Sequence, residues 1–108
     1  MKKTIRAVMK RPGQEPYEII IRNELEELQT LVEGCVEAFP LPGTGDILIV
    51  CNEEGKYNGM AANFKVPYDI IFGPVLFLGR AGEEFDDCPV SADVIKGAIM
   101  AWRSCRDM

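Results

Sequence analysis

Cysteine and histidine decide which side-chain chemistry this chain can perform. The sequence contains four cysteines, no two of them closer than 16 positions, and no histidine at all. Without histidine there is no Ser–His or Cys–His nucleophile pair, and no imidazole base or metal ligand. A zinc site made of thiolates uses closely spaced pairs of cysteines, which this spacing lacks. We therefore expect no metal, no cofactor and no catalytic residue, because an enzyme here would have to rely on carboxylates, lysine or cysteine. In a reducing cytosol, Cys35, Cys51, Cys88 and Cys105 are expected to be core residues.

Two short motifs resemble ligand sites but favour simpler interpretations. The "GTGD" segment at 43–46 leads into a strand-like run, whereas a phosphate-binding glycine loop opens a helix. We interpret it as a turn. The "GEEFDDC" segment at 82–88 groups four acids without the alternating spacing of a calcium loop. It is expected to be a solvated acidic loop, because adjacent carboxylates normally diverge.

The charge of the chain limits its partners. The formal net charge is −5, from 17 acids and 12 bases, which argues against a long nucleic acid as partner. The basic N-terminal stretch "KKTIRAVMKR" is the exception, and on a strand Arg6 and Lys10 would share one face. A solvated strand face is the simpler interpretation. If the protein binds a nucleotide, Arg6, Lys10 and Arg80 are the candidate phosphate-binding residues.

The segment "VCNEEGKYNGMAANF" at 50–64 is the main candidate for a recognition surface. "NEEGK" has the composition of a turn, and Asn58-Gly59 is a second turn signal. We expect a strand end, a first turn, a short stub around Lys56 and Tyr57, and then a loop. This mixture of aromatic and polar side chains suits a binding surface, although a loop anchored to the core by Tyr57 and Phe64 is the simpler interpretation. The candidate binding residues are Asn52, Glu53, Lys56, Tyr57, Asn63 and Phe64.

The elements that position these residues follow from hydrophobic periodicity. "TIRAVMK" and "YEIIIRN" alternate as two strands joined by a Pro-Gly turn, and they predict an antiparallel hairpin. Further strands are expected at 35–39 and 46–51, and within "YDIIFGPVLFLGR". Pro74 marks an edge, a bulge or a break in that last run, because proline cannot donate to a ladder.

Two helices are expected. Asn23 stands three residues before Glu26, like a capping box, and Gly34 is the expected residue after the helix. The second helix runs from Ser91, its cap, to about Cys105. Trp102 lies on its apolar stripe and is expected to be a core anchor. Gly97 interrupts this helix and suggests close packing.

This order of elements predicts a single α+β domain over residues 1–108. We expect a mostly antiparallel sheet of about five strands with two helices, in ββαββ(β)βα order, and both helices on one face. No apolar run approaches the ~20 residues that cross a bilayer, and the start lacks the apolar region of a signal peptide. We therefore expect a cytoplasmic protein with no membrane partner.

Three stretches resemble one known family. They are "IRAVMKRPGQEPYEIIIRNELEELQTLVEG", the "CNEEGK" segment with a following glycine and asparagine, and "DIIFGPVLFLG" before an acidic loop. In this order they are similar to domain of unknown function 3846, found in small proteins of Firmicutes, their phages and conjugative elements. The resemblance implies a small mobile-element protein and no defined activity. Asn52, Glu53, Gly55 and Asn63 are positions of the family pattern, and "MAAN" replaces a segment that often contains proline.

Two functions are consistent with these observations. The first is a non-catalytic accessory protein that binds a partner macromolecule, such as a host protein, with self-association left open. The alternative is a small-ligand protein that binds a nucleotide signal and counteracts a host defence pathway. In that case the basic residues would hold phosphates, and Tyr57 or Phe64 would stack on the base.

Overall fold

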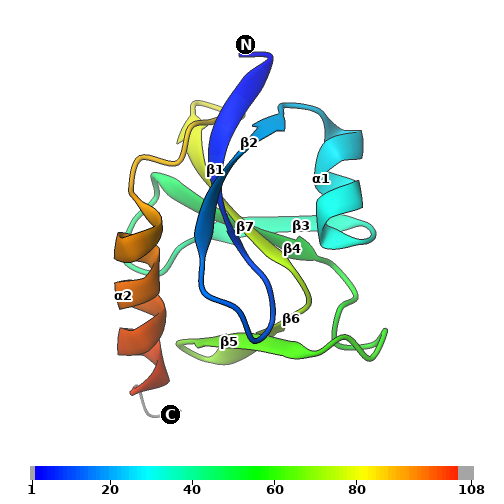
Figure 1. The fold of residues 1–108 in the computed structure, drawn as a ribbon, viewed down its shortest axis with the longest axis vertical. Helices are drawn as coiled ribbons and strands as arrows, with labels where there is room; N and C mark the ends of the chain where they lie inside the picture. The colour runs from blue at the N-terminus through cyan, green and yellow to red at the C-terminus, as the bar shows by residue number, and fades with distance from the viewer. Residues whose placement is uncertain (1, 105–108) are drawn as a thin grey trace.

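The computed structural model describes residues 2–104 as one sheet with a helix on each face and a small hairpin beneath (Figure 1). In chain order the elements are β1 (Thr4–Lys10), β2 (Tyr17–Arg22), α1 (Leu25–Val32), β3 (Val36–Pro40), β4 (Ile47–Asn52), β5 (Ala62–Val66), β6 (Asp69–Phe72), β7 (Val75–Ala81), β8 (Glu84–Asp86) and α2 (Ala92–Arg103). This α+β architecture, with a mostly antiparallel sheet and two helices, confirms the predicted fold class.

The main sheet has the strand order β2-β1-β7-β4-β3, and β8 pairs with the end of β7. Every pairing is antiparallel, with Phe77 opposite both Val8 and Ile49. β5 and β6 form a separate two-stranded hairpin. The apolar run that contains Pro74 is therefore broken there, and its two halves, β6 and β7, lie in different sheets.

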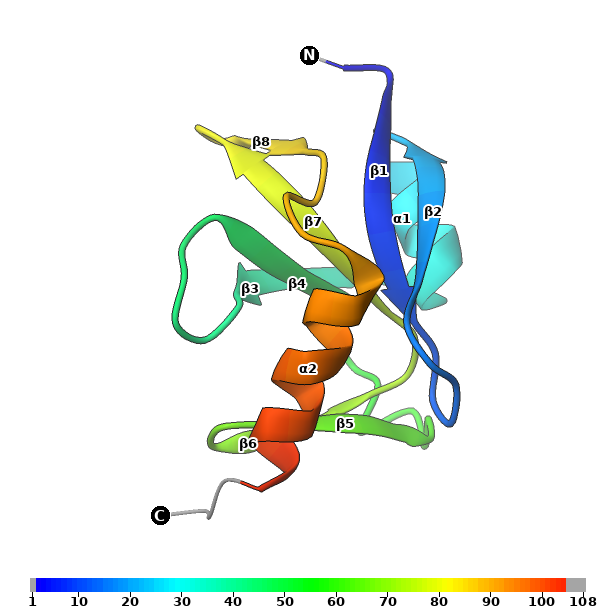
Figure 2. The same ribbon diagram turned by 60° about the vertical axis from the view of Figure 1, so that its left-hand side comes forward.

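The two helices cover opposite faces of the sheet, so the prediction that both lie on one face is wrong (Figures 1 and 2). Alternation along β1 directs Ala7 and Met9 toward the core that contains α1 residues, and Val8 toward the core that contains α2 residues. Strands that are apolar on both faces need cover on both sides. On the α2 side the cover is completed by the β5–β6 hairpin, which contributes Phe64 and Ile71 to the same core.

The two helices begin differently. Ser91 caps α2 as predicted, because its hydroxyl accepts from the Val94 N–H at 3.3 Å. The cap predicted at Asn23 is wrong: α1 begins after Glu24, which makes no side-chain cap. The Asn23 amide instead donates to the Lys2 carbonyl at 3.1 Å. A local capping pattern was overruled by a tertiary contact with the start of β1.

Three further predictions concern single side chains. Trp102 is buried and stacks on Phe64 with 6.0 Å between ring centroids, which confirms it as a core anchor. The prediction of close packing at Gly97 is wrong, since a Cβ there would meet open space. Cys51 and Cys88 are buried as predicted, Cys35 is exposed and so is not a core thiol, and Cys105 lies outside the described residues.

Candidate functional site

The connection between β4 and β5 contains both predicted turns, since the Gly55 N–H donates to the Asn52 carbonyl and the Gly59 N–H donates to the Lys56 carbonyl, each at 3.4 Å. The two turns overlap in a single helical turn. The Asn58 N–H donates to the Glu54 carbonyl at 2.8 Å, and the Met60 N–H donates to the Gly55 carbonyl at 3.0 Å. Gly59 closes the turn with a φ of 72°, a conformation that glycine adopts without strain. The turn is pressed against the end of β6, because a Cβ on Gly55 would lie 2.6 Å from the Phe72 carbonyl oxygen.

Asn52, a predicted binding residue, is an internal brace. Its amide nitrogen donates to the carbonyls of Val32 and Glu33, each at 3.1 Å, at the C-terminus of α1. Its amide oxygen accepts from the Glu54 N–H at 2.7 Å. The side chain is only 6% exposed. Asn52 thus joins α1 to the helical turn, and both its amide nitrogen and its amide oxygen are engaged in the fold.

Asn63 and Phe64 are also internal. The Asn63 amide donates to the carbonyls of Lys10 at 2.7 Å and Gly73 at 2.8 Å, and its oxygen accepts from Lys10 Nζ at 2.9 Å. Phe64 is buried between Phe77 and Trp102. Both belong to strand β5, where the sequence suggested a loop. The predicted aromatic loop therefore presents only Tyr57 to solvent.

The outer residues of this region form a continuous surface with two adjoining hollows. Tyr57 is 89% exposed and lines one hollow, and Tyr68 is 84% exposed and lines the other. Lys56, Asp69 and Ile70 line both hollows, and Ile70 is 48% exposed. We call these five residues the tyrosine surface. Of the predicted binding residues, Asn52 and Glu53 line the first hollow, and Lys56 and Tyr57 belong to the tyrosine surface.

Tyr68 was missed by the sequence analysis, although the hairpin gives it an unusual conformation. Val66 pairs with Asp69, so Pro67 and Tyr68 form a two-residue turn. Tyr68 has a φ of 81°, at a position where a type II turn usually has glycine or asparagine. A bulky residue in this conformation is strained by about 1–2 kcal/mol. The signal in the sequence was a proline followed by tyrosine and aspartate between two apolar runs.

The tyrosine surface has an acidic border and no reactive thiol. Glu37 and Glu53 line the first hollow together with Asp69, whereas Lys56 is the single base among its lining residues. Cys51 lies at the floor of this hollow. Burial, together with the charges of Glu37 and Asp69, raises its pKa to about 11. The thiol is therefore protonated at neutral pH and is a poor nucleophile.

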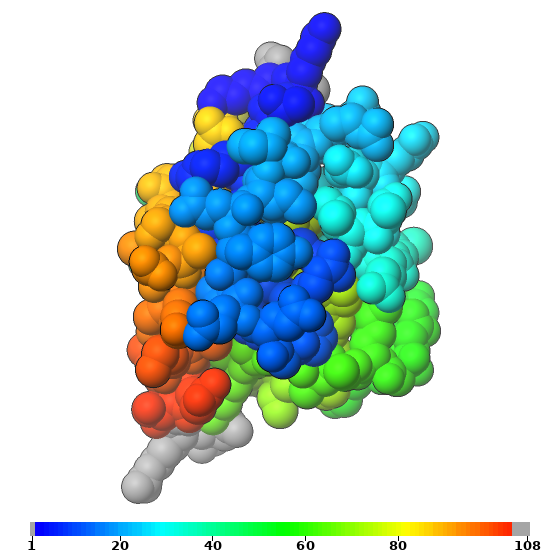
Figure 3. All heavy atoms as spheres, in the orientation of Figure 1, coloured from blue at the N-terminus to red at the C-terminus, as the bar shows by residue number. Residues whose placement is uncertain are grey.

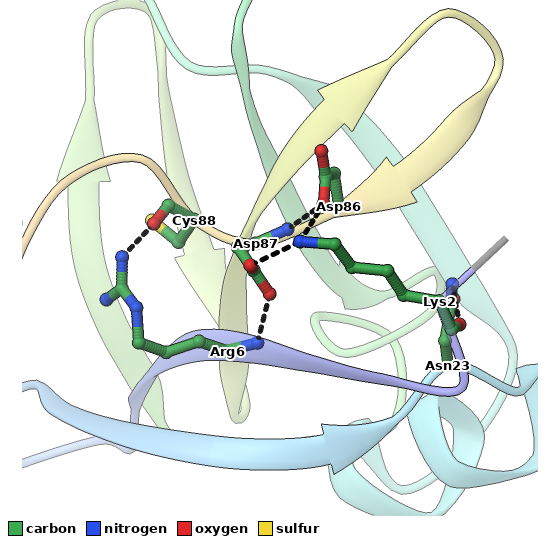
Figure 4. A network of polar contacts seen from close by, with 6 residues as sticks. All are labelled: Lys2, Arg6, Asn23, Asp86, Asp87 and Cys88. Carbon is green, nitrogen blue, oxygen red and sulfur yellow. Dashed lines mark hydrogen bonds and ion pairs between the residues drawn. The ribbon is translucent and has the colours of Figure 1, made fainter.

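The structure does not bring Arg6, Lys10 and Arg80 together as one phosphate site. Arg6 and Lys10 are separated by four residues along β1, about 13 Å in an extended strand. The Arg6 guanidinium donates to the Cys88 carbonyl, as Figure 4 shows, and to the Val90 carbonyl at 3.3 Å. Arg80 donates to the Gly82 carbonyl at 2.9 Å. Lys10 lines the groove beside α2.

The acidic segment at 82–88 is not the solvated loop that we expected, because Glu84–Asp86 form strand β8, paired with β7. Its end is bound to the start of β1 (Figure 4). Lys2 Nζ lies 3.1 Å from Asp86 and 2.6 Å from Asp87, and Asp87 also accepts from the Arg6 N–H at 2.8 Å. Bonds to Lys2 and to the Arg6 N–H lower the pKa of Asp87. Its backbone fits only because Gly79 has no Cβ, which would lie under 2 Å from the Asp87 carbonyl. Within residues 2–104, no three Cys, Asp or Glu side chains are grouped so as to hold a metal ion.

A third hollow, the groove beside α2, lies between the β1–β2 loop, β5 and the C-terminal half of α2. Lys10, Lys96 and Arg103 line it together with Glu15 and Asn63. Lys96 and Arg103 lie seven positions apart on one face of α2. Their approach to Lys10 depends on how α2 packs, so no local pattern could have revealed it.

Comparisons with known proteins yield one match. A family model described as a domain of unknown function (DUF3846) matches residues 5–102, nearly the whole chain; the match includes the tyrosine surface and ends one residue before Arg103. No curated protein and no solved structure matches the chain. In the described part of the chain, neither helix has the length and apolar character to cross a membrane.

Proposed function

This chain belongs to the DUF3846 family, and from that membership together with the tyrosine surface we propose that it is a non-catalytic binding protein for a protein partner. One observation carries the proposal. Two tyrosines more than 80% exposed stand on adjoining hollows, around a half-exposed isoleucine. Tyrosine is enriched among the residues that dominate protein–protein affinity.

The energetics of the two tyrosines favour this role. An aromatic side chain that enters an interface buries on the order of 150–250 Å² and loses little rotamer freedom. Neither ring contributes to the described core clusters, so folding does not account for their presence. The strained φ of Tyr68 is an additional cost, and such strain concentrates at functional positions.

The charges around the tyrosine surface indicate the chemistry of the partner. Glu37, Glu53 and Asp69 outnumber Lys56 among the residues that line the first hollow. A complementary surface would carry arginine or lysine around an apolar centre, and arginine also stacks on tyrosine. Such a surface would associate faster at low salt, because the charges at the rim steer the encounter.

A binding role also agrees with the composition. The chain has no histidine, and Cys51, the thiol at the tyrosine surface, has a pKa of about 11. The sequence likeness to proteins of phages and conjugative elements supports a role as an accessory protein of such an element. In this proposal the partner is a host protein met during propagation of the element.

The test compares partner capture by wild type and by the double variant Tyr57→Ser/Tyr68→Ser. Tyr17→Ser is the matched control, because Tyr17 is a less exposed tyrosine on β2. Host lysate is passed over each immobilised variant. We would purify any protein that binds to wild type and to the control but not to the double variant. Calorimetry would then measure its affinity, with at least tenfold loss expected in the double variant. Equal affinity for the double variant would contradict the proposal.

Sedimentation of the purified chain tests the alternative that the tyrosine surface binds a second copy of this chain. The proposal predicts a monomer in the absence of partner. If wild type forms a dimer and the double variant is a monomer, the partner of the tyrosine surface is a second copy of this chain and not a host protein.

A further inference from the structure

The groove beside α2 holds a buried cation that the proposed function does not use. It has a volume of about 420 Å³ and is lined by the β1–β2 loop, by Lys10 and Asn63, and by the C-terminal half of α2. Figure 3 shows the loop, in blue, lying beside the orange and red atoms of α2. The ion pair between Glu15 and Lys96, 2.6 Å long, joins the loop to the helix at the rim.

Lys10 is the unusual residue of this groove. Its side chain is only 8% exposed, although its head group is an ammonium. Nζ donates to two neutral oxygens, the Arg11 carbonyl at 2.8 Å and the Asn63 amide oxygen at 2.9 Å. An ammonium has three N–H donors, so within the described residues one donor is unused. No carboxylate of residues 2–104 lies within 4 Å of it. A buried charge without a counter-ion is expensive.

Arg103 adds a second cation to the same place. It lies in the last turn of α2, lines the groove, and its charge together with burial lowers the pKa of Lys10. No ion pair or side-chain hydrogen bond joins Arg103 to any other residue in the described range. Lys96 is a third cation, and Glu15 is the single carboxylate among the residues that line the groove. The lining therefore has an excess of positive charge in an acidic protein.

We infer that this groove is a binding site for a small organic oxyanion, held between Lys10 and Arg103. A phosphate or carboxylate group would accept the unused N–H of Lys10 and a pair of N–H groups from the Arg103 guanidinium. The anion supplies the counter-charge that Lys10 lacks and separates two cations that otherwise repel. The site differs from the tyrosine surface in both its residues and its ligand.

The remaining lining residues fit the rest of such a ligand. Ile99 and Met100 of α2 and Pro16 of the loop provide apolar surface beside the cations. Met100 is 54% exposed, so the face is open to solvent. The volume lies within the range of about 300–1,000 Å³ typical of small-molecule sites. An anion with an aromatic or aliphatic group would therefore bind more tightly than the bare ion.

The experiment titrates the full-length chain with inorganic phosphate, phenyl phosphate and benzoate, at ionic strength held constant with sodium chloride. Binding is followed by the NMR shifts of backbone amides in the β1–β2 loop and the end of α2. We expect saturable shifts, with phenyl phosphate tighter than inorganic phosphate. The comparison of phenyl phosphate with benzoate identifies which oxyanion the site prefers.

Variants assign the binding to the two cations. Arg103→Gln changes an exposed residue and is expected to fold, and the half-saturating concentration of phenyl phosphate should rise about tenfold, the value of one charged hydrogen bond. Lys10→Met should do at least the same, with its fold checked by circular dichroism. Lys3→Gln, a basic residue outside the groove, should bind like wild type.

Three results would overturn the inference. One is the absence of saturable shifts for all three probes with wild type. Another is equal binding by wild type and Arg103→Gln. The third concerns Asp107, which follows Arg103 by four positions in the sequence. If Asp107→Asn bound phosphate at least tenfold more tightly than wild type, the chain's own carboxylate, and not an external ligand, would be the groove's anion.

Discussion

The tyrosine surface and the groove beside α2 are built on the same β5–β6 hairpin but present opposite chemistry. The first is aromatic, acidic at its border and open to solvent, whereas the second surrounds a buried ammonium with further cations. Asn63 of β5 lines the groove, and Asp69 and Ile70 of β6 belong to the tyrosine surface. The difference teaches that one small hairpin can contribute to two surfaces of different chemistry, because its two strands face different neighbours.

Asn63→Ala should produce the largest effect, because it removes the link between the hairpin and β1. Two carbonyls and the Lys10 ammonium lose a partner. We expect the free energy of unfolding to fall by about 3 kcal/mol, since each buried group left unsatisfied costs about 1–3 kcal/mol. Urea denaturation measures this, with Asn58→Ala on the exposed turn as the control. A loss no greater than that of the control would contradict the bracing role of Asn63.

Gly55→Ala should damage the tyrosine surface while leaving the groove intact. The new Cβ would lie 2.6 Å from the Phe72 carbonyl oxygen, so the helical turn that carries Tyr57 must shift. We expect a loss of about 2 kcal/mol in the free energy of unfolding, as for other overpacked sites, together with weaker partner capture. Phenyl phosphate binding should be unchanged.

Gly59→Ala is the matched control for Gly55→Ala. Its Cβ meets nothing within 4 Å, and the positive φ alone should cost about 1 kcal/mol. If both variants lose the same stability and partner affinity, the contact with Phe72 does not position the turn.

Tyr68→Asn should separate binding from stability within the tyrosine surface. Asparagine tolerates the positive φ that strains tyrosine, so the free energy of unfolding should rise by about 0.5 kcal/mol. Affinity for the partner should nevertheless fall about tenfold. Tyr57→Asn should weaken binding similarly without the gain in stability. A drop in stability for Tyr68→Asn would mean that the ring contributes to the fold.

Two lysines should give the smallest effects, of opposite sign, at alkaline pH. The pKa of Lys2 is raised by hydrogen bonds to Asp87 and Asp86, so its stabilisation is present below the ordinary value of 10.5 and is lost as pH rises through the raised pKa. The pKa of Lys10 is lowered by burial and by Arg103, so its penalty is present at neutral pH and is relieved as pH rises through the lowered pKa.

Urea midpoints between pH 8 and pH 11 check this contrast. In Lys2→Met, the urea midpoint should fall less as the pH rises than it does in wild type. In Lys10→Met, the rise of the urea midpoint that deprotonation of Lys10 causes should be absent. The same direction of change in both variants would contradict the assignment of Lys10 as a buried cation without a counter-ion.

Local signals predicted the elements of this fold well and the candidate site only in part. Ser91 and the apolar stripe of α2 were recognised because a cap and a helical period lie within a few residues of each other. The capping pattern at Asn23 was equally local but wrong, because α1 begins one residue later than the pattern indicates and the Asn23 side-chain nitrogen donates to the Lys2 carbonyl. The family-pattern residues Asn52 and Asn63 were taken for ligand contacts, and the structure assigns them to the fold.

The sequence by itself determined the α+β class, the antiparallel hairpins and the absence of imidazole chemistry. These depend on composition, on periods of two or 3.6 residues and on turn residues, all of which act over short distances. Only the tertiary structure decided that the helices cover opposite faces, that Tyr57 is exposed and shares a surface with Tyr68, and that Lys10 and Arg103 line one groove. Each of these results depends on the packing of elements far apart in the chain, where the burial of apolar faces outweighs local preference.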